Sequence, residues 1–466
     1  MSGGTSNPGI AGWGVLLKGA NAWRSLVLCG GVALHAINLY VAATVLPSVV
    51  RDIGGIDFYA WNTSLFVVGS ILGAAASGAA LYRFSPGRAY ALASVVFAAG
   101  STVCAIAPMM QVLIAGRVVQ GLGGGMLLAL PYAMIRIAFE PGLWPRAMAL
   151  ISGMWGLATL LGPAFGGALA DLGAWRLAFG ALAPLAILFA AIAMRTLPAD
   201  KNRTGEAGLP RIQLVLLCAA VLAVSLGSVA PGIAGQAAGL IAGLALLVRL
   251  ARVERSSRVR LLPHGALRPA HPLGALYATM ALLAVTVTCS EVFVPLFLQE
   301  LHALGPFAAG VLAGVMSAGW TAGSVAASGA GASGAARLLR SAPWLAAAGM
   351  FLLMLLVSED SGGDWRTLAL IVTALVLVGF GVGVAWPHLA TLVMRTAPEG
   401  EADLASSSIM TVQLVATAMS TAIAGIVLNL AGIGEPGGAA NASRWLFGLF
   451  AFAPLLSVCI PVRRQT

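Results

Sequence analysis

Long apolar runs separated by short polar segments occupy nearly the whole chain. Each run is about 20 residues long, which is the length an α-helix needs to cross roughly 30 Å of hydrocarbon. Helices are the expected form, because backbone that faces lipid must satisfy its own hydrogen bonds and these runs are too long for barrel strands. The pattern predicts an all-α polytopic membrane protein with about 14 transmembrane helices. The runs lie at approximately 25–50, 58–81, 88–107, 110–135, 147–171, 177–195, 212–231, 233–250, 272–299, 307–330, 340–357, 367–393, 404–432 and 445–462.

Two polar interruptions divide these runs into groups. Residues 197–211 form the longest polar break in the first half, and 252–272 form a second, strongly basic one. Between them, 212–250 contains two apolar segments separated by a turn-like Pro-Gly stretch at 228–235. Two six-helix groups with a ligand site between them are typical of secondary transporters. The predicted units are an N-terminal six-helix bundle at 1–196, cytoplasmic linkers with two extra helices (about 212–250) at 197–271, and a C-terminal six-helix bundle at 272–466.

Composition and motifs exclude several classes of protein. The chain is 59% hydrophobic and 9% charged, with a mean hydropathy of +0.93, which is incompatible with an ordinary soluble domain. The sequence contains no HExxH pair, no P-loop and no convincing nucleophile elbow, so neither an enzyme nor ATP-driven transport is predicted. No cysteine spacing suggests a metal or a disulfide, and no cofactor is expected. The cysteines all lie in apolar runs: Cys29, Cys104, Cys218, Cys289 and Cys459.

The positions of the cations predict the orientation, because Lys and Arg in short loops favour the cytoplasmic side. This places both termini on the cytoplasmic side, and the expected membrane is a bacterial plasma (inner) membrane. The net charge of +10 then reflects topology and attraction to membrane lipids, and does not indicate nucleic acid. One face receives Lys18, Arg24, Arg83, Arg88, Arg136, Arg146, the groups Arg195 to Arg211 and Arg249 to Arg268, Arg337, Arg340, Arg395, Arg463 and Arg464, and the other only Arg51, Arg176, Arg366 and Arg444.

Arg117 is the first candidate for function. It shares one helical face with Gln120, Gly121 and Gly124, at spacings of three, four and seven residues. A charged side chain at membrane depth costs a few kcal/mol or more, so it usually faces a protein interior or a cavity on a transport path. Arg117 is therefore a proton-coupling candidate and Gln120 a substrate-cavity candidate. The alternative is a structural arginine bound to carbonyl groups.

Glu291 lies well inside an apolar run and is the leading proton-carrier candidate. Burial favours its protonated form and a nearby cation such as Arg117 favours its ionised form, so a change of surroundings could load and release a proton. Thr288, Glu291, Pro295 and Gln299 recur at roughly helical spacing and predict a polar stripe on a helix that the proline can break locally. The alternative is a static carboxyl group that fixes helix packing.

Other polar and aromatic positions complete the candidate cavity. His35 titrates in a useful range, which makes it a third proton-coupling candidate, and Asn38 lies on the same helical face. Helix contacts and interface anchoring are the alternatives for all of these side chains. The substrate-cavity candidates are Asn38, Gln120, Tyr132, Trp155, Thr288, Gln299, Trp386 and His388, with Trp320 as a further aromatic wall.

In the fifth apolar run, Gly162, Pro163, Gly166 and Gly167 form a compact cluster. The proline frees a backbone carbonyl group and the glycines remove side-chain bulk, so another helix could pack and slide against this surface. We predict a conformational role, with simple tight packing as the alternative.

These motifs together resemble the major facilitator superfamily, and within it the fourteen-span drug:proton antiporters. Arg117, Gln120, Gly121 and Gly124 are similar to that superfamily's fourth-span motif, and the LLGPAFGG stretch is similar to the fifth-span motif of exporters. Residues 174–184 are similar to the opening of its sixth span. Residues 44–55 and 294–306 are similar to the ends of its first and seventh spans. The resemblance covers nearly the whole chain.

Two positions depart from the family pattern. The loop at 78–90 keeps Arg83, Gly87 and Arg88, which the resemblance adds to the conformational motif, but it has Tyr82 near a position that is usually acidic. Asn38 stands where many fourteen-span antiporters have an aspartate. Proton coupling would then depend on Glu291 or a histidine, and uncoupled transport gains support.

The resemblance implies a secondary active transporter that exports amphipathic organic compounds or drugs by proton antiport with alternating access. Its expected partners are a small organic substrate, protons and membrane lipids, and we expect a monomer. One alternative is an uncoupled or differently coupled exporter or facilitator of a metabolite or lipid-like compound. Another is a non-transporting membrane scaffold or sensor, which the lack of a sizeable soluble region disfavours.

Overall fold

The computed structural model describes residues 13–140, 143–197, 209–268, 270–327, 330 and 332–460. Every regular element in these ranges is helical. Thirteen of the described helical segments are long and apolar enough to cross a membrane. The fourteenth predicted span, at 445–462, corresponds to two shorter helices separated at Ala451. The predicted cytoplasmic termini and most of the 197–211 linker lie outside the described residues.

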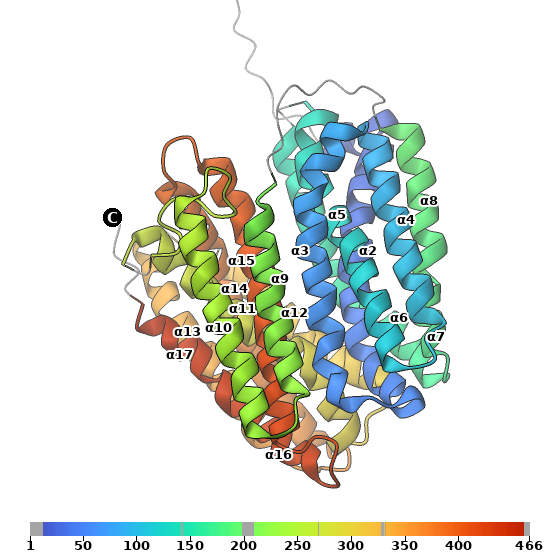
Figure 1. Cartoon of the computed structure of the whole chain (residues 1–466), viewed down its shortest axis with the longest axis vertical. Helices are drawn as coiled ribbons and strands as arrows, with labels where there is room; N and C mark the ends of the chain where they lie inside the picture. The colour runs from blue at the N-terminus through green and yellow to red at the C-terminus, as the bar shows by residue number, and fades with distance from the viewer. Residues whose placement is uncertain are drawn as a thin grey trace, which may run out of the picture.

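The described helices form two bundles and a hairpin (Figure 1). The first bundle contains α2 (Gly19–Ile53), α3 (Tyr59–Arg83), α4 (Pro86–Ala105), α5 (Met110–Ala138), α6 (Trp144–Asp171) and the broken pair α7 (Trp175–Gly180) and α8 (Leu182–Thr196), with short α1 (Trp13–Leu16) and η1 (Ile56–Phe58). The hairpin is α9 (Arg211–Ser228) and α10 (Gly232–Ser256). The second bundle contains α11 (Pro272–Leu301), α12 (Pro306–Ala327), α13 (Ala332–Leu356), α14 (Trp365–Thr396), α15 (Ala402–Leu430), α16 (Gly438–Phe450) and α17 (Phe452–Val458).

The two ends of the bundles are defined by the connections between helices. At the linker end, uppermost in Figure 1, α3 ends at Arg83 and α9 begins at Arg211. At the opposite end, α2 stops at Gly54, whose φ of 72° suits a residue without a side chain. There α14 also begins after Asp364, whose carboxylate accepts a hydrogen bond from Thr367 N at 3.0 Å as a helix cap.

Close helix packing within each bundle depends on glycine. A Cβ added to Gly125 on α5 would lie 1.9 Å from the carbonyl oxygen of Ser70 on α3. A Cβ added to Gly379 on α14 would lie 1.9 Å from the carbonyl oxygen of Met316 on α12. Lipid drives helices together only weakly, so such backbone approach is a main source of packing energy.

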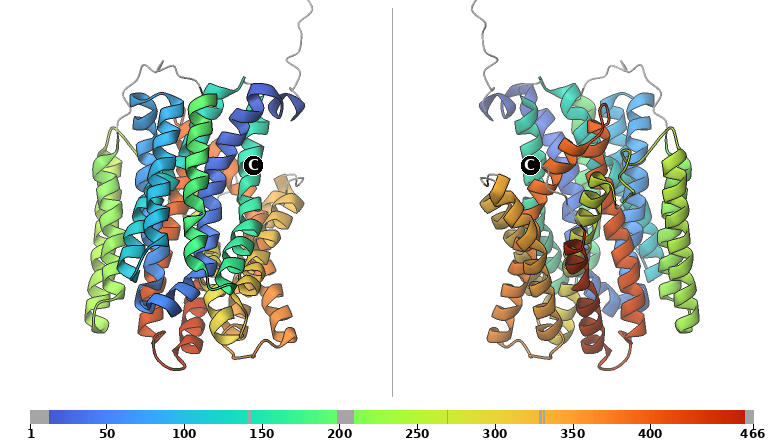
Figure 2. Two further views of the ribbon diagram at one scale, coloured as in Figure 1. Left: turned by 90° about the vertical axis from the view of Figure 1, so that its right-hand side faces the viewer. Right: turned by 90° about the vertical axis from the view of Figure 1, so that its left-hand side faces the viewer.

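The hairpin bridges the two bundles through α9. Near its end, Trp61 on α3 donates a hydrogen bond from Nε1 to Ser228 Oγ at 3.1 Å. Asn429 on α15 donates from Nδ2 to the Ser228 carbonyl oxygen at 2.8 Å. Helix α10 lies on the outer flank (Figure 2), where Ile233 and Ile241 are 74% and 67% exposed. This apolar outer face suits contact with lipid.

Candidate functional site

A cavity of about 360 Å³ lies between the two bundles, near the middle of their length. Its walls come from α2, α3, α5 and α6 of the first bundle and from α11, α12, α14 and α15 of the second. The predicted candidates that line it are His35, Tyr132, Trp155, Thr288, Glu291 and Trp386, together with Trp320. The fold thus brings together side chains that are up to 351 residues apart in sequence, from His35 to Trp386.

Glu291 forms a hydrogen bond across the cavity. Tyr40 on α2 donates from its hydroxyl group to Glu291 Oε1 on α11 at 3.1 Å, so the bond joins the two bundles. Both side chains also line a smaller pocket of about 10 Å³, together with Pro163 and Pro295. This pocket continues the cavity toward the opposite end. Sequence reasoning missed Tyr40, whose only signal was a hydroxyl group inside an apolar run.

Each bundle contributes a pair of rings to the cavity wall. Trp320 on α12 and Trp386 on α14 have ring centroids 5.2 Å apart. His35 on α2 and Trp155 on α6 have centroids 6.1 Å apart, in an edge arrangement. Aromatic faces attract cations and apolar rings alike. The cavity therefore presents broad aromatic surfaces beside one carboxyl group.

Hydroxyl and amide groups add polar contacts to the second bundle's side of the cavity. Thr288 Oγ1 on α11 lies 3.0 Å from Thr417 Oγ1 on α15, and both residues line the cavity. Gln413 on α15 also lines it. Thr417 and Gln413 were not predicted from the sequence, because α15 carries several polar residues and only the fold decides which face the cavity.

Arg117 is fully buried within the first bundle. It donates from Nη1 to Asn38 Oδ1 at 3.1 Å and to Gln120 Oε1 at 2.5 Å, and from Nε to the Asn62 carbonyl oxygen at 3.4 Å. Gln120 in turn donates to Ser101 Oγ at 2.8 Å. All three acceptors of the guanidinium group are neutral. Asn38 and Gln120 thus lie in an internal network outside the cavity wall, rather than among the side chains that face the cavity.

Phe66 connects this network to the cavity. The guanidinium carbon of Arg117 lies 4.0 Å from the centroid of the Phe66 ring, and Phe66 lines the cavity. The glycines of the Arg117 motif make this arrangement possible. A Cβ on Gly121 would lie 2.1 Å from the Phe66 carbonyl oxygen, and one on Gly124 would lie 3.0 Å from His35 Nδ1. They let α5 approach α3 and α2 closely enough to set both rings at the wall.

At the opposite end, hydrogen bonds join the two bundles. Arg51 on α2 donates from Nη2 to Gln299 Oε1 on α11 at 3.3 Å, and its Nη1 lies 3.8 Å from Glu300 Oε1. Gln299 donates back to the Thr44 carbonyl oxygen on α2 at 3.2 Å. Gln299 is therefore part of this end closure and lies outside the cavity wall. Asp171 Oδ2 also accepts a hydrogen bond from Phe307 N at 3.2 Å.

The Gly-Pro cluster of α6 lies at the same junction. A Cβ on Gly162 would lie 2.5 Å from Tyr40 Cβ, and one on Gly166 would lie 3.1 Å from Val41 Cα, so α6 packs tightly on α2. A Cβ on Gly167 would lie 2.5 Å from Phe307 Cα on α12, across the two bundles. Pro163 lines the small pocket beside Tyr40. The cluster thus positions Tyr40 and lets the bundles touch.

The remaining predicted residues lie away from the cavity. Arg83 and Arg88 are exposed at the linker end. Gly87 starts α4 against α8, where an added Cβ would lie 3.0 Å from the Ala193 carbonyl oxygen. His388 is partly buried on α14, two residues beyond Trp386, but does not line the cavity. A shift of two positions on a helix turns a side chain toward the opposite face.

Comparisons with known proteins match the chain to one superfamily of membrane transporters. The family model described as Major Facilitator Superfamily matches residues 28–421. The chain is 38% identical over 436 residues to a "probable multidrug-efflux transporter" of Mycobacterium tuberculosis (strain CDC 1551 / Oshkosh), with 91% of each protein covered. It is 25% identical over 377 residues to "multidrug resistance protein 3" of Bacillus subtilis (strain 168), covering 78% of this chain and 71% of that one. A solved POT family transporter in complex with 5-aminolevulinic acid shares the fold, with a TM-score of 0.68, 13% identity, and coverage of 95% of this chain and 97% of that chain.

Proposed function

The chain belongs to the Major Facilitator Superfamily and is a multi-pass membrane transporter, and from this premise we propose that it exports amphipathic organic compounds by proton antiport. The proposed location is a bacterial inner membrane, with the linker end in the cytoplasm. The efflux names of the relatives from Mycobacterium tuberculosis and Bacillus subtilis support the direction of transport.

The observation that carries the proposal is the bond between Tyr40 and Glu291. It places a titratable carboxyl group in the central cavity, at a contact between the two bundles. An ionised Glu291 can pair with a cationic substrate, and a protonated Glu291 cannot. Competition between a proton and a cation for one carboxyl group is a direct physical basis for antiport.

The side chains that line the cavity support the proposal of an amphipathic substrate with aromatic or cationic character. The tryptophan pair of α12 and α14 faces the cavity together with Trp155, and a cation against such faces gains roughly 0.5–2 kcal/mol. Glu291 supplies the opposite charge.

The proposed cycle moves the two bundles against each other. The closure at the opposite end, through Arg51 and Gln299, breaks when the cavity opens there. Gly167 against Phe307 is the contact on which α6 slides past α12. We assign residues 1–196 and 272–466 to the two moving bodies. In the present conformation, the hairpin at about 212–250 is bonded to both bodies through Ser228.

His35 and Arg117 have secondary roles in this proposal. His35 lines the cavity and provides a second titratable group beside Trp155. Arg117 acts through Phe66, which its guanidinium group holds against the cavity wall. Its role is to position the wall, since its own side chain bonds Asn38 and Gln120 inside the bundle.

The test is substrate-driven proton movement in liposomes that contain a pH-sensitive dye. We expect an imposed gradient of a lipophilic cation to move protons with the native protein, and Glu291→Gln to abolish the pH response. Glu359→Gln, an exposed carboxyl group outside the spans, is the matched control and is expected to behave like the native protein. A pH response that survives in Glu291→Gln would overturn the assignment of Glu291.

A specific observation favours an uncoupled exporter as the second candidate. Arg117 bonds the neutral Asn38 at the position where the family resemblance leads one to expect an aspartate. Tyr82, in place of the usual loop acid, is 50% exposed. Substrate flux without any change of internal pH, unaffected by Glu291→Gln, would establish this candidate in place of antiport.

A further inference from the structure

A second, apolar cavity of about 400 Å³ lies between the hairpin and the second bundle, and we call it the hairpin groove. Its walls include Leu217 on α9, Leu247 on α10, Tyr277 on α11 and Met419 on α15. It is separate from the central cavity. On α15, Val412 and Val415 face the groove, whereas Gln413, Leu414 and Thr417 line the central cavity. The wall residues 411–419 span about 12 Å along α15 at 1.5 Å per residue, which gives the groove an elongated shape.

The linker end of the groove opens into a small basic pocket of about 40 Å³. Glu254, Leu262 and Leu267 line both spaces, so the two are continuous. The pocket is also lined by Arg255, Arg260 and Arg268. Residues 249–271 contain six arginines against one glutamate, which concentrates positive charge at this mouth.

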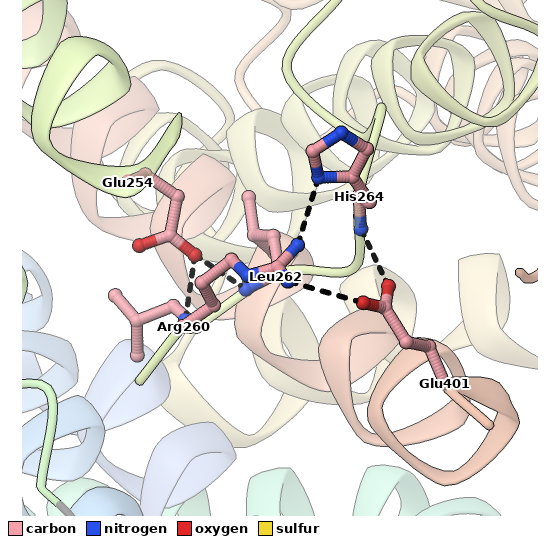
Figure 3. A network of polar contacts seen from close by, with 6 residues as sticks. Glu254, Arg260, Leu262, His264 and Glu401 are labelled. Carbon is pink, nitrogen blue, oxygen red and sulfur yellow. Dashed lines mark hydrogen bonds and ion pairs between the residues drawn. The ribbon is translucent and has the colours of Figure 1, made fainter. Parts of the chain in front are cut away.

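Hydrogen bonds hold the mouth in shape (Figure 3). Glu254 Oε1 accepts from the backbone nitrogens of Leu261 and Leu262, at 2.6 and 2.8 Å. Glu401, before α15, pairs with Arg260 at 3.3 Å and accepts from His264 N at 2.6 Å. The connecting segment is thereby tied to the hairpin on one side and to the second bundle on the other. The pocket is built rather than formed by a loose loop.

Glu254 carries an unsatisfied acceptor at the junction of pocket and groove. The residue is only 4% exposed, and its Oε2 has no hydrogen-bond partner among the described residues. Leaving a buried charged group without a partner is costly, so a ligand with an N–H donor would be stabilised at this atom. Arg260 is occupied by Glu401. Arg255 uses Nη2 for the Leu267 carbonyl oxygen at 3.1 Å and keeps further donors, and Arg268 is exposed.

We propose that the hairpin groove binds one amine-bearing phospholipid from the membrane leaflet at the linker end. One of its acyl chains occupies the groove, its phosphate lies between Arg255 and Arg268, and its ammonium group donates to Glu254 Oε2. Three separate features fit this one ligand: an apolar chamber, free arginine donors at its mouth, and an orphaned carboxylate oxygen between them. A lipophilic cation matches Glu254 but is repelled by the arginines, and free phosphate leaves the groove empty.

The first experiment uses the native full chain and needs no variant. Delipidated protein in detergent is titrated with phosphatidylethanolamine, phosphatidylcholine or phosphatidylglycerol with identical acyl chains, and retained lipid is counted by native mass spectrometry. We expect phosphatidylethanolamine to be retained at least tenfold more than phosphatidylcholine, whose quaternary amine has no N–H donor. Phosphatidylglycerol, which lacks the amine, is expected to be retained as weakly. Equal retention of all three lipids would overturn the proposal, and so would displacement of the lipid by a lipophilic cation or by inorganic phosphate.

Variants then assign the contacts. Glu254→Gln keeps an acceptor for Leu261 and Leu262 but places an NH₂ group at the Oε2 position, so we expect the preference for phosphatidylethanolamine to fall to about one. Arg255→Gln combined with Arg268→Gln is expected to weaken retention of phosphatidylethanolamine and phosphatidylcholine alike. Glu435→Gln, at the opposite end, is the matched control. An unchanged lipid preference in Glu254→Gln would refute the amine contact.

Discussion

Tyr40 and Glu291 meet across the two bundles, with the Tyr40 hydroxyl group 3.1 Å from Glu291 Oε1. The glycine at 162 makes the meeting possible, since a side chain there would collide with Tyr40 Cβ. One bond therefore connects the carboxyl group in the cavity to the packing motif of α6. We therefore propose that Tyr40 couples the contents of the cavity to movement of the two bundles.

Tyr40→Phe tests this relationship directly. The change keeps the ring and removes the hydroxyl donor, and a hydrogen bond to a charged group contributes about 1.5–3 kcal/mol. We expect substrate-driven proton movement to fall by roughly tenfold or more, since 1.4 kcal/mol corresponds to a factor of ten. Tyr82→Phe, at an exposed position, is the control. Equal activity of the two variants would show that the bond has no part in transport.

The closure at the opposite end is expected to depend more on Gln299 than on Glu300. Gln299 is 7% exposed, and Gln299→Ala removes its hydrogen bonds to the Thr44 carbonyl oxygen and from Arg51, each of which contributes about 0.5–1.5 kcal/mol. The Arg51–Glu300 pair is 51% and 42% exposed, and such surface pairs contribute about 0–1 kcal/mol. Labelling of an Ala43→Cys thiol from each side of a liposome, in a background without native cysteines, measures opening. Gln299→Ala should increase labelling from the opposite end, and a larger effect from Glu300→Ala would contradict the prediction.

Gly167→Ala is expected to disturb transport and Gly153→Ala is not, although both glycines lie on α6. The added methyl group at 167 would lie 2.5 Å from Phe307 Cα, whereas nothing lies within 4 Å of one at 153. Overpacking of this kind costs about 1–3 kcal/mol, and here it separates the bundles. Ala43→Cys labelling from the opposite end should rise in Gly167→Ala alone. Matching transport rates in both variants would leave the α6–α12 contact without a conformational role.

Asn38→Asp is expected to stabilise the protein. The new carboxylate would lie beside Arg117 Nη1, at the present 3.1 Å contact, and would give a buried cation its opposite charge. Charge-assisted hydrogen bonds contribute about 1.5–3 kcal/mol, so the midpoint of thermal unfolding should rise. In an Arg117→Gln background the same change should lower the midpoint, because the carboxylate is then buried without a cation. A rise in both backgrounds would exclude the pair as its cause.

Because His302 is buried, we expect the folded protein to lose stability in mild acid. Its ring lies at the end of α11, with Nδ1 2.6 Å from Ser361 Oγ and Nε2 donating to the Val357 carbonyl oxygen at 3.3 Å. Burial lowers the pKa of His302 below its ordinary 6.5, against the opposing effects of the Val357 bond and Asp360. The unfolded chain therefore binds the proton first as the pH falls. This contribution to stability is complete above pH 6.5 and decreases below it. His302→Gln should weaken the decline in unfolding midpoint between pH 7 and 5, and an unchanged decline would assign it to other groups.

The fold was largely predictable because membrane insertion depends on local composition. Apolar runs of helical length gave the spans, and the comparisons confirm the predicted superfamily. Among the described spans, the sixth and the last differ from a single long helix, because the chain breaks at Ala181 between α7 and α8 and at Ala451 between α16 and α17.

The site was predictable only in part. The sequence indicated Glu291 as a carboxyl group inside an apolar run and Trp386 as an aromatic wall. Both line the cavity. Gln299 is polar and in helical phase with Glu291, yet it lies about two turns farther toward the opposite end and bonds Arg51 there. The position of a residue along its span determines whether its side chain lines the cavity or joins the closure at the opposite end. The polar stripe alone did not show where along α11 the cavity ends.

By itself, the sequence determined the helices and the few side chains too costly to leave in lipid, because each of these depends on the local content of the chain. Only the tertiary structure decided that Tyr40 would face Glu291, that Arg117 would bond Asn38 behind Phe66, and that Glu254 would line an apolar groove. Helical periodicity fixes the direction of a side chain around its own axis. It does not fix which neighbouring helix that direction meets, because that depends on packing between segments hundreds of residues apart.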